Sequence, residues 1–117
     1  MPHLNLEYSK NLSFDAQAAL LQLNTALIES GQFIENEIQS RATGFDDFLI
    51  GNVGEGRAFI HIKLRILSGR SAEVKKSLAA TLAQAIHIDH PAQLNIQIRT
   101  EIIDIDRDSY TKINIGE

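Results

Sequence analysis

Residues 58–66 read AFIHIKLRI, in which Ala58, Ile60, Ile62, Leu64 and Ile66 alternate with Phe59 and the polar residues His61, Lys63 and Arg65. Alternation with a period of two is typical of a β-strand that buries one face and leaves the other in contact with polar surroundings. The strand leads into Gly69-Arg70-Ser71, where glycine favours a turn and Ser71 is a good N-cap for a helix. This stretch therefore predicts a strand, a tight turn and the start of a helix.

Apolar residues at helical spacing follow the turn and form one face: Val74, Leu78, Leu82, Ala85 and Ile86. The pair His90-Pro91 is expected to end this helix, because proline disfavours helical backbone in the residue before it. A last strand is expected from about Leu94 to Ile105.

The first half of the chain has the same order of elements. Leu4, Leu6 and Tyr8 alternate with polar residues, which predicts a strand, and Pro2 shares the parity of the apolar set. Ser13 is the expected N-cap of a helix that ends at Gly31. The expected apolar stripe of this helix is Ala16, Leu20, Leu23 and Leu27.

A second strand is expected from about Ile38 to Phe48. It carries Gln39 and Arg41 on one side, because residues two apart in a strand share a face. The glycine-rich loop at 51–56 has no Lys-Ser/Thr of a phosphate loop, so we expect a hairpin connection there.

The whole chain is therefore expected to be one α+β domain built from a duplicated β-α-β unit. Repeat one spans about 2–50, repeat two about 57–106, and a tail covers 107–117. Right-handed crossovers would place both helices on one face of a four-stranded mixed sheet. The other face would stay uncovered, with Phe59 among polar residues, and we expect it to meet another subunit.

Composition excludes several classes of function. The 117 residues are 44% hydrophobic and 22% charged, with a net charge of −4 and no cysteine. These values are typical of a soluble globular protein and do not favour binding to nucleic acid or to a membrane. Without cysteine there are no disulfides or thiol nucleophiles. No signal peptide is recognisable, so a cytoplasmic location is expected.

Metal sites are not expected. Asp104, Asp106 and Asp108 are spaced like the start of a calcium loop, but the central glycine and the distal glutamate are missing. His87 and His90 lack a third ligand at a suitable spacing. We interpret these groups as surface residues.

The candidate catalytic residue is Pro2. Methionine aminopeptidases remove Met1 when a small residue follows it, which would leave Pro2 with a free secondary amine. An ordinary α-amino group titrates at about 7.7–8.0. Burial and a nearby guanidinium both disfavour its charged form, so such an amine is a plausible general base near neutral pH.

These features resemble the tautomerase superfamily, and within it the 5-carboxymethyl-2-hydroxymuconate isomerases. The resemblance rests on Met1-Pro2-His3 and on the strand at 58–66 running into Gly69-Arg70-Ser71. It covers most of residues 1–106, and the second half alone is similar to the short subunit of 4-oxalocrotonate tautomerase. It implies a trimer without a cofactor, in which Pro2 is the general base and Arg70 binds substrate.

One departure from the family is visible on the second strand. Related isomerases read Ile-Arg-Ser-Arg where this chain reads Ile38-Gln39-Ser40-Arg41. Glutamine therefore replaces the first arginine, and Arg41 remains as the second anion-binding candidate on this strand, beside Gln39.

The resemblance predicts a homotrimeric, cofactor-independent isomerase that acts on an unsaturated keto-acid in aromatic compound degradation. Two alternatives remain open. The same fold and Pro2 could support decarboxylation or dehalogenation, an alternative that the change at Gln39 keeps open. A non-enzymatic trimer that binds a ligand or a partner protein would be favoured by a retained Met1.

Overall fold

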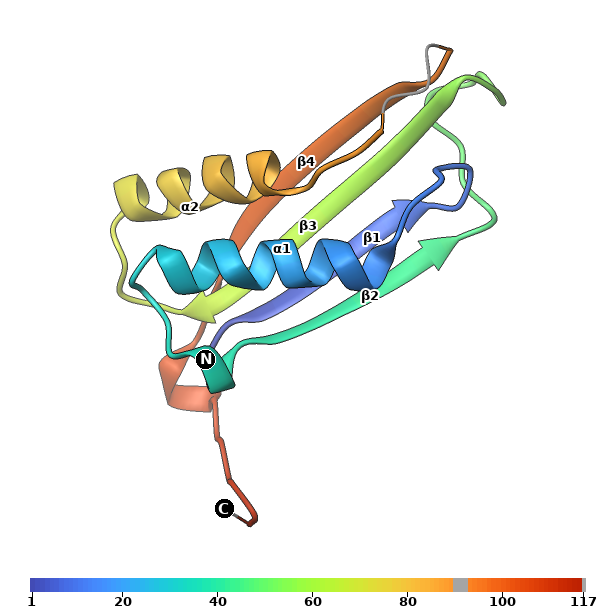
Figure 1. Cartoon of the computed structure of the whole chain (residues 1–117). Coiled ribbons are helices and arrows are strands. Elements are labelled where there is room, and N and C mark those ends of the chain that lie inside the picture. The colour runs from blue at the N-terminus through green and yellow to red at the C-terminus, as the bar shows by residue number, and fades with distance from the viewer. Residues whose placement is uncertain (90–92, 117) are drawn as a thin grey trace.

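A computed structural model describes residues 1–89 and 93–116 of the chain. Six main elements follow one another as strand, helix, strand, strand, helix, strand (Figure 1). They are β1 (His3–Ser9), α1 (Ala16–Glu29), β2 (Gln39–Phe45), β3 (Arg57–Leu67), α2 (Ala72–Ala85) and β4 (Asn95–Ile105). Short 3-10 turns lie at Glu35–Glu37 and Arg107–Ser109. Neither helix in the described residues is long and apolar enough to cross a membrane.

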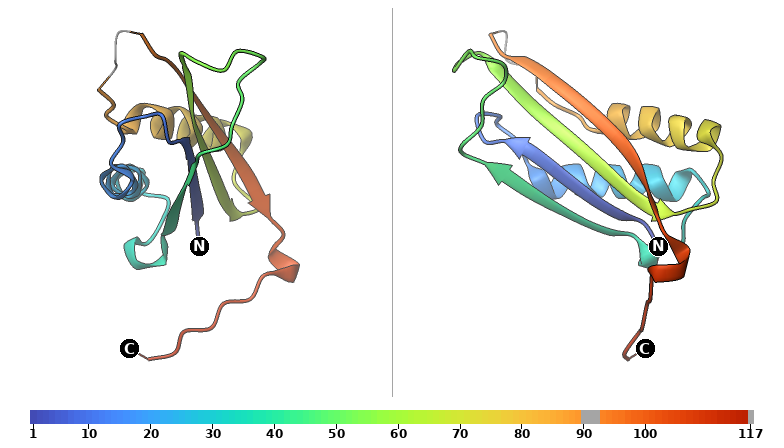
Figure 2. Two further views of the ribbon diagram at one scale, coloured as in Figure 1. Left: turned by 90° about the vertical axis from the view of Figure 1, so that its right-hand side faces the viewer. Right: turned by 180° about the vertical axis from the view of Figure 1, so that it is seen from behind.

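The four strands form one mixed sheet in the order β2-β1-β3-β4. β1 is parallel to β2 and β3 is parallel to β4, whereas the central pair β1 and β3 is antiparallel. Both helices cover the same face of this sheet, as the view from behind shows (Figure 2). The expected fold class is thereby confirmed.

The core lies between the sheet and the helices. The alternation in β3 places every second residue, from Ala58 to Ile66, in this layer with at most 1% of its surface exposed. Leu23 and Leu27 of α1 and Leu82 of α2 are fully buried against it. Burying an aliphatic side chain of this size contributes about 1.5–3 kcal/mol, so this layer fixes the positions of the strand ends that carry the site.

The opposite face of the sheet is largely polar, apart from a cluster of aromatic rings and the aliphatic residues Leu67, Ile103 and Ile105. His61 Nε2 lies 2.9 Å from Glu101 Oε1 on this face. Phe59 contacts the rings of Phe45 and Phe48, with centroids 6.1 and 5.9 Å away. Phe59 therefore packs against its own chain, and the contact of this face with another subunit stays a prediction.

Two helix boundaries differ from the sequence prediction. The N-cap of α1 is Asp15 rather than Ser13, and its Oδ1 accepts a hydrogen bond from the Ala18 N–H at 3.1 Å. Phe14 packs against Tyr8, with ring centroids 4.8 Å apart, which holds the chain outside the helix until Asp15. α2 ends at Ala85, before the predicted pair His90-Pro91, of which both residues lie outside the described ones.

The connection between the two halves is not a hairpin. β1 lies between β2 and β3, so residues 46–56 pass beyond the end of β1 to reach β3. Within this loop a bridge between Ile50 and Val53 closes a local turn. β2 is also shorter than predicted, because it ends at Phe45, and Phe48 lies in the loop.

Candidate active site

The predicted site residues gather at one end of the sheet. β1 and β2 begin there, β3 and β4 end there, and the chain terminus N lies close to the start of β2 (Figure 1). Pro2 is fully buried, as its parity with the apolar residues of β1 predicted. Its carbonyl oxygen accepts a hydrogen bond from the Gln39 N–H at 3.1 Å. This hydrogen bond fixes the backbone of Pro2 against the start of β2.

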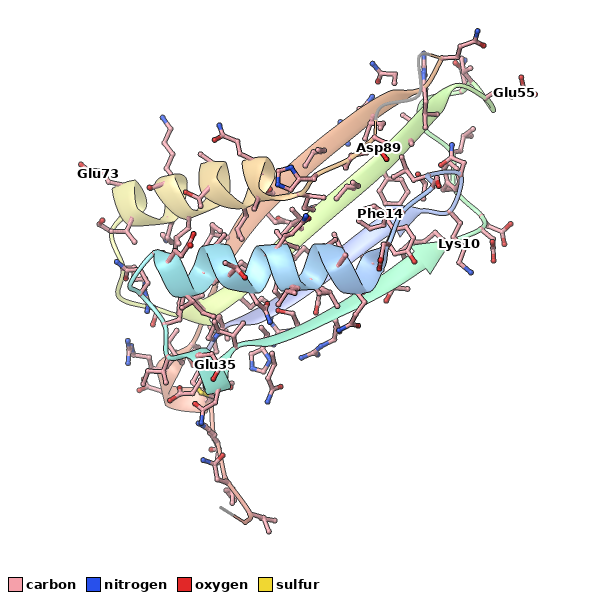
Figure 3. All side chains as sticks on the ribbon, in the orientation of Figure 1. Lys10, Phe14, Glu35, Glu55, Glu73 and Asp89 are labelled. Atoms are coloured by element: carbon pink, nitrogen blue, oxygen red, sulfur yellow. The ribbon has the colours of Figure 1, made fainter. Side chains whose placement is uncertain are left out.

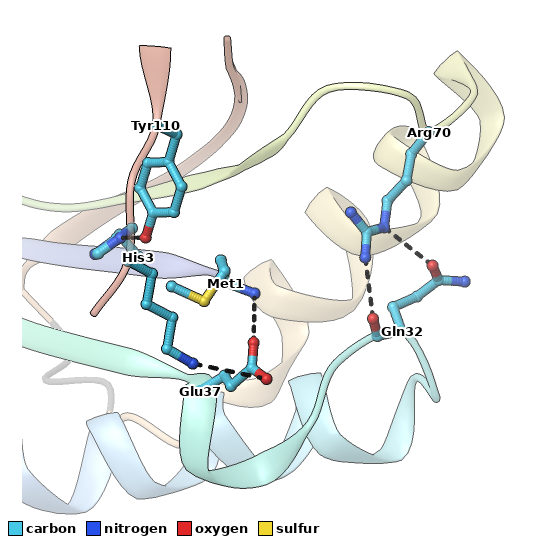
Figure 4. Close-up of polar contacts among 7 residues, drawn as sticks. Met1, His3, Gln32, Glu37, Arg70 and Tyr110 are labelled. Carbon is cyan, nitrogen blue, oxygen red and sulfur yellow. Dashed lines mark hydrogen bonds and ion pairs between the residues drawn. The ribbon is translucent and has the colours of Figure 1, made fainter. Parts of the chain in front are cut away.

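A carboxylate faces the chain terminus. The Met1 amine lies 3.5 Å from Glu37 Oε1 (Figure 4). The other oxygen of the same carboxylate, Oε2, lies 3.8 Å from Lys112 Nζ. Glu37 is thus placed between a terminal amine and a lysine of the C-terminal tail.

His3 links the two strands to the tail on the open face of the sheet. Its Nδ1 lies 3.3 Å from Arg41 Nη2, and its Nε2 lies 2.8 Å from Tyr110 Oη (Figure 4). Arginine has only donors, so Nδ1 is the acceptor, and the proton assigned to Nε2 is donated to Tyr110. Burial lowers the pKa of His3 below its usual value of 6.5, and the charges of Arg65, Arg41 and the chain terminus lower it further. The ring is therefore neutral at pH 7.

Gln39 and Arg41 share one face of β2, as predicted, and this is the open face of the sheet. They stand opposite His3 and Asn5 of β1 in the strand register, and both are exposed. Arg41 uses one nitrogen for His3, and its guanidinium has further N–H groups that can bind an anion.

Arg70 is placed at the same end but on the helix side. Its Nε donates to Gln32 Oε1 at 3.1 Å, and its Nη2 donates to the Gln32 carbonyl at 3.0 Å (Figure 4). The guanidinium carbon also lies 4.7 Å from the centre of the Phe33 ring. These contacts fix the guanidinium against the segment between α1 and β2. Within the described chain, none of them joins Arg70 to Pro2.

Sequence reasoning missed the contribution of the tail. Tyr110 contacts His3, and Lys112 contacts Glu37. These partners are separated by 107 and 75 positions in the sequence, and no local pattern indicates such contacts. Arg107 donates a hydrogen bond from Nε to the Ser68 carbonyl, which ties the start of the tail to the turn before α2. All-atom side chains at this end and elsewhere are drawn in Figure 3.

Residues 1–89 and 93–116 contain no cluster of three or more His, Asp or Glu side chains that could hold a metal ion. Asp104 instead pairs with Lys75 at 3.3 Å. Asp106 Oδ2 accepts a hydrogen bond from the Ser109 hydroxyl at 2.8 Å. Of the two histidines considered above, His87 is exposed and His90 lies outside the described residues.

A family model for 5-carboxymethyl-2-hydroxymuconate isomerase matches residues 2–116. The chain belongs to this family. Membership supports an isomerase of the tautomerase type and confirms the resemblance seen in the sequence. No curated protein matches the sequence.

Solved structures show the same fold. A 5-carboxymethyl-2-hydroxymuconate isomerase from Deinococcus radiodurans R1 is 29% identical, with a TM-score of 0.81 over 97% of this chain and 90% of that one. A fused 4-OT symmetric trimer is 23% identical, with a TM-score of 0.68 over 96% and 92% of the two chains. A malonate semialdehyde decarboxylase, FG41, is 15% identical, with a TM-score of 0.69 over 97% and 90%. One fold therefore hosts more than one reaction.

Proposed function

We propose that this protein is a cofactor-independent tautomerase in which the amine of Pro2, freed by removal of Met1, is the general base. The observation that supports this most is the placement of Pro2. Its ring is fully buried and its carbonyl is held by the Gln39 N–H. A base fixed in this way meets the substrate in one geometry, and fixed geometry is a large part of the rate enhancement in proton transfer.

The proposed reaction moves one proton along an enol or dienol that is conjugated to a ketone. The Pro2 amine takes the proton, negative charge spreads over the dienolate, and the resulting ammonium returns the proton to a different atom of the substrate. The substrate is neither oxidised nor reduced, and no group leaves. Arg70 is the proposed partner of the developing charge, because a guanidinium binds an enolate or carboxylate with two parallel hydrogen bonds.

The proposed substrate is an unsaturated keto-acid of aromatic compound degradation. The name of the matched family, which refers to a hydroxymuconate, supports this class. Arg41 and Gln39 are proposed to hold a substrate carboxylate from the second strand. A panel of enols and dienols tests the proposal, and 3-haloacrylates and a β-keto-acid in the same panel test the dehalogenase and decarboxylase alternatives.

We also propose that the active form is a homotrimer. The polar face of the sheet is covered by neither helix, and a similar fold forms a symmetric trimer. Closed rings are a common way to cover such a face. Light scattering should give three times the chain mass of 13.0 kDa, whereas a stable monomer at micromolar concentration would contradict this assembly.

A Pro2→Ala variant separates catalysis from assembly. It should keep the trimer and lose most of its activity, because a primary amine differs from proline in basicity and geometry. A fully active Pro2→Ala variant would instead favour a different base. A wild-type trimer that retains Met1 and turns over no member of the panel would favour the non-enzymatic alternative.

A further inference from the structure

A cavity of about 300 Å³ lies directly beside the chain terminus. Met1 and Gln39 line it on one side, and tail residues from Lys112 to Gly116 line it on the other. Met1 is bonded to the Pro2 nitrogen, so the removal of Met1 opens the wall of this cavity next to the proposed base. The cavity therefore extends from Met1, the residue next to the proposed base, to the tail.

Two side chains, one at the start of the 3-10 turn at Arg107–Ser109 and one just after it, hold the tail against this end of the sheet. Arg107 is hydrogen-bonded to the Ser68 carbonyl, and Tyr110 accepts the bond from His3 at 2.8 Å. These anchors lie five and two residues before Lys112. They place Lys112 at the mouth of the cavity with its side chain 36% exposed, which leaves the ammonium accessible to a ligand.

In the chain that still carries Met1, a carboxylate lies between the Met1 amine and Lys112. The two oxygens of Glu37 lie 3.5 Å from the Met1 amine and 3.8 Å from Lys112 Nζ. Both distances are long for charge-assisted hydrogen bonds, which are usually about 2.7–2.9 Å. The pair is loose enough for Lys112 to exchange Glu37 for another carboxylate.

We propose that Lys112 binds the remote carboxylate of a dicarboxylate substrate in this cavity. The inference rests on the proposed function, because it takes the reacting end of the substrate to lie at Pro2. Arg41 does not line this cavity, and Gln39, which does, is neutral and supplies hydrogen bonds only. Among the lining side chains, Lys112 supplies the positive charge for a carboxylate that reaches the tail. Lys112 is thus a specificity-determining residue, and Glu37 competes with the substrate for it.

The test compares two saturated, non-isomerising probes of equal chain length: 2-oxoadipate, which has two carboxylates, and 2-oxohexanoate, which has one. Calorimetry on the trimer, with Met1 removal verified by mass, measures their affinities. Lys112→Met should lower the affinity for 2-oxoadipate by about 3- to 10-fold, which is the range for a partly exposed charged contact. The same variant should change the affinity for 2-oxohexanoate by less than about twofold, because this probe does not reach Lys112.

Three further variants separate charge from structure. Lys112→Arg should keep most of the affinity, because it keeps the positive charge. Lys76→Met, at an exposed position of α2, removes the same charge elsewhere and should change neither affinity. Glu37→Gln should raise the affinity for 2-oxoadipate, because it removes the carboxylate that competes for Lys112.

Equal affinity of Lys112→Met and wild type for 2-oxoadipate would overturn the inference. An equal loss for both probes would also overturn it, because Lys112 would then act on the end that the probes share. A wild type that binds neither probe counts against it too. Selective loss in an enzyme that turns over no enol would leave the inference standing and refute the proposed reaction.

Discussion

Replacing Arg70 by alanine should separate its structural role from its proposed role in catalysis. The side chain makes two hydrogen bonds to Gln32 and one contact with the Phe33 ring. At an exposed site, two such bonds and one cation–π contact together stabilise the fold by about 1–2 kcal/mol. The loss of a cation that contacts the developing charge costs about 2–4 kcal/mol in the transition state, or about 30- to 900-fold in kcat/KM.

Two assays measure these effects separately. Urea unfolding gives the loss of folding free energy, and the decay of enol absorbance gives kcat/KM for the same protein sample. Gln32→Ala is the matched control, since it removes the side-chain acceptor of Arg70 and leaves its charge. It should lower stability by less than Arg70→Ala and reduce kcat/KM much less. If Arg70→Ala keeps kcat/KM within about threefold of wild type, the guanidinium does not contact the developing charge.

The other residues of the site give three further predictions. The pKa of His3 is lowered in the folded chain. The unfolded chain therefore binds more protons around and below pH 6.5. The free energy of unfolding should fall as the pH drops from 6.5 through the folded pKa. Urea midpoints at several pH values between 5 and 7.5 measure this loss, and His3→Asn should reduce the slope; an unchanged slope would assign the dependence to other groups. Arg41→Ala should mainly raise KM if the guanidinium holds a remote carboxylate, and Gln39→Arg should shift preference towards dicarboxylates. Kinetics on matched mono- and dicarboxylate enols check both, and an unchanged preference in both variants would show that β2 does not line the pocket.

The sheet could be predicted from the sequence because its signal is local. In β3 the alternation from Ala58 to Ile66 directly records which face is buried. The N-cap of α1 could not be chosen in this way, since Ser13 and Asp15 are both good caps two residues apart. The choice depends on the packing of Phe14 against Tyr8, a contact with another element.

Strand order was the part of the topology that local patterns could not supply. The glycine-rich loop signals a reversal, but the insertion of β1 between β2 and β3 decides whether that reversal is a hairpin. That insertion depends on the pairing of the two halves of the chain.

The candidate site was predictable only in part, for a similar reason. The burial of Pro2 and the shared face of Gln39 and Arg41 follow from strand parity, which needs only short-range information. Glu37 and Lys112 become neighbours because the tail returns to the start of the chain. Their sequence surroundings carry no periodicity that would single them out.

The central claim is that the free amine of Pro2 is the base, and one comparison tests it most directly. The activity of the processed chain is measured beside that of a chain extended at its N-terminus so that it resists processing, with both masses verified. The extension converts the amine of Pro2 into an amide, which has no basic lone pair. The account predicts that turnover is lost while the trimer remains. Full activity in the extended chain would contradict it.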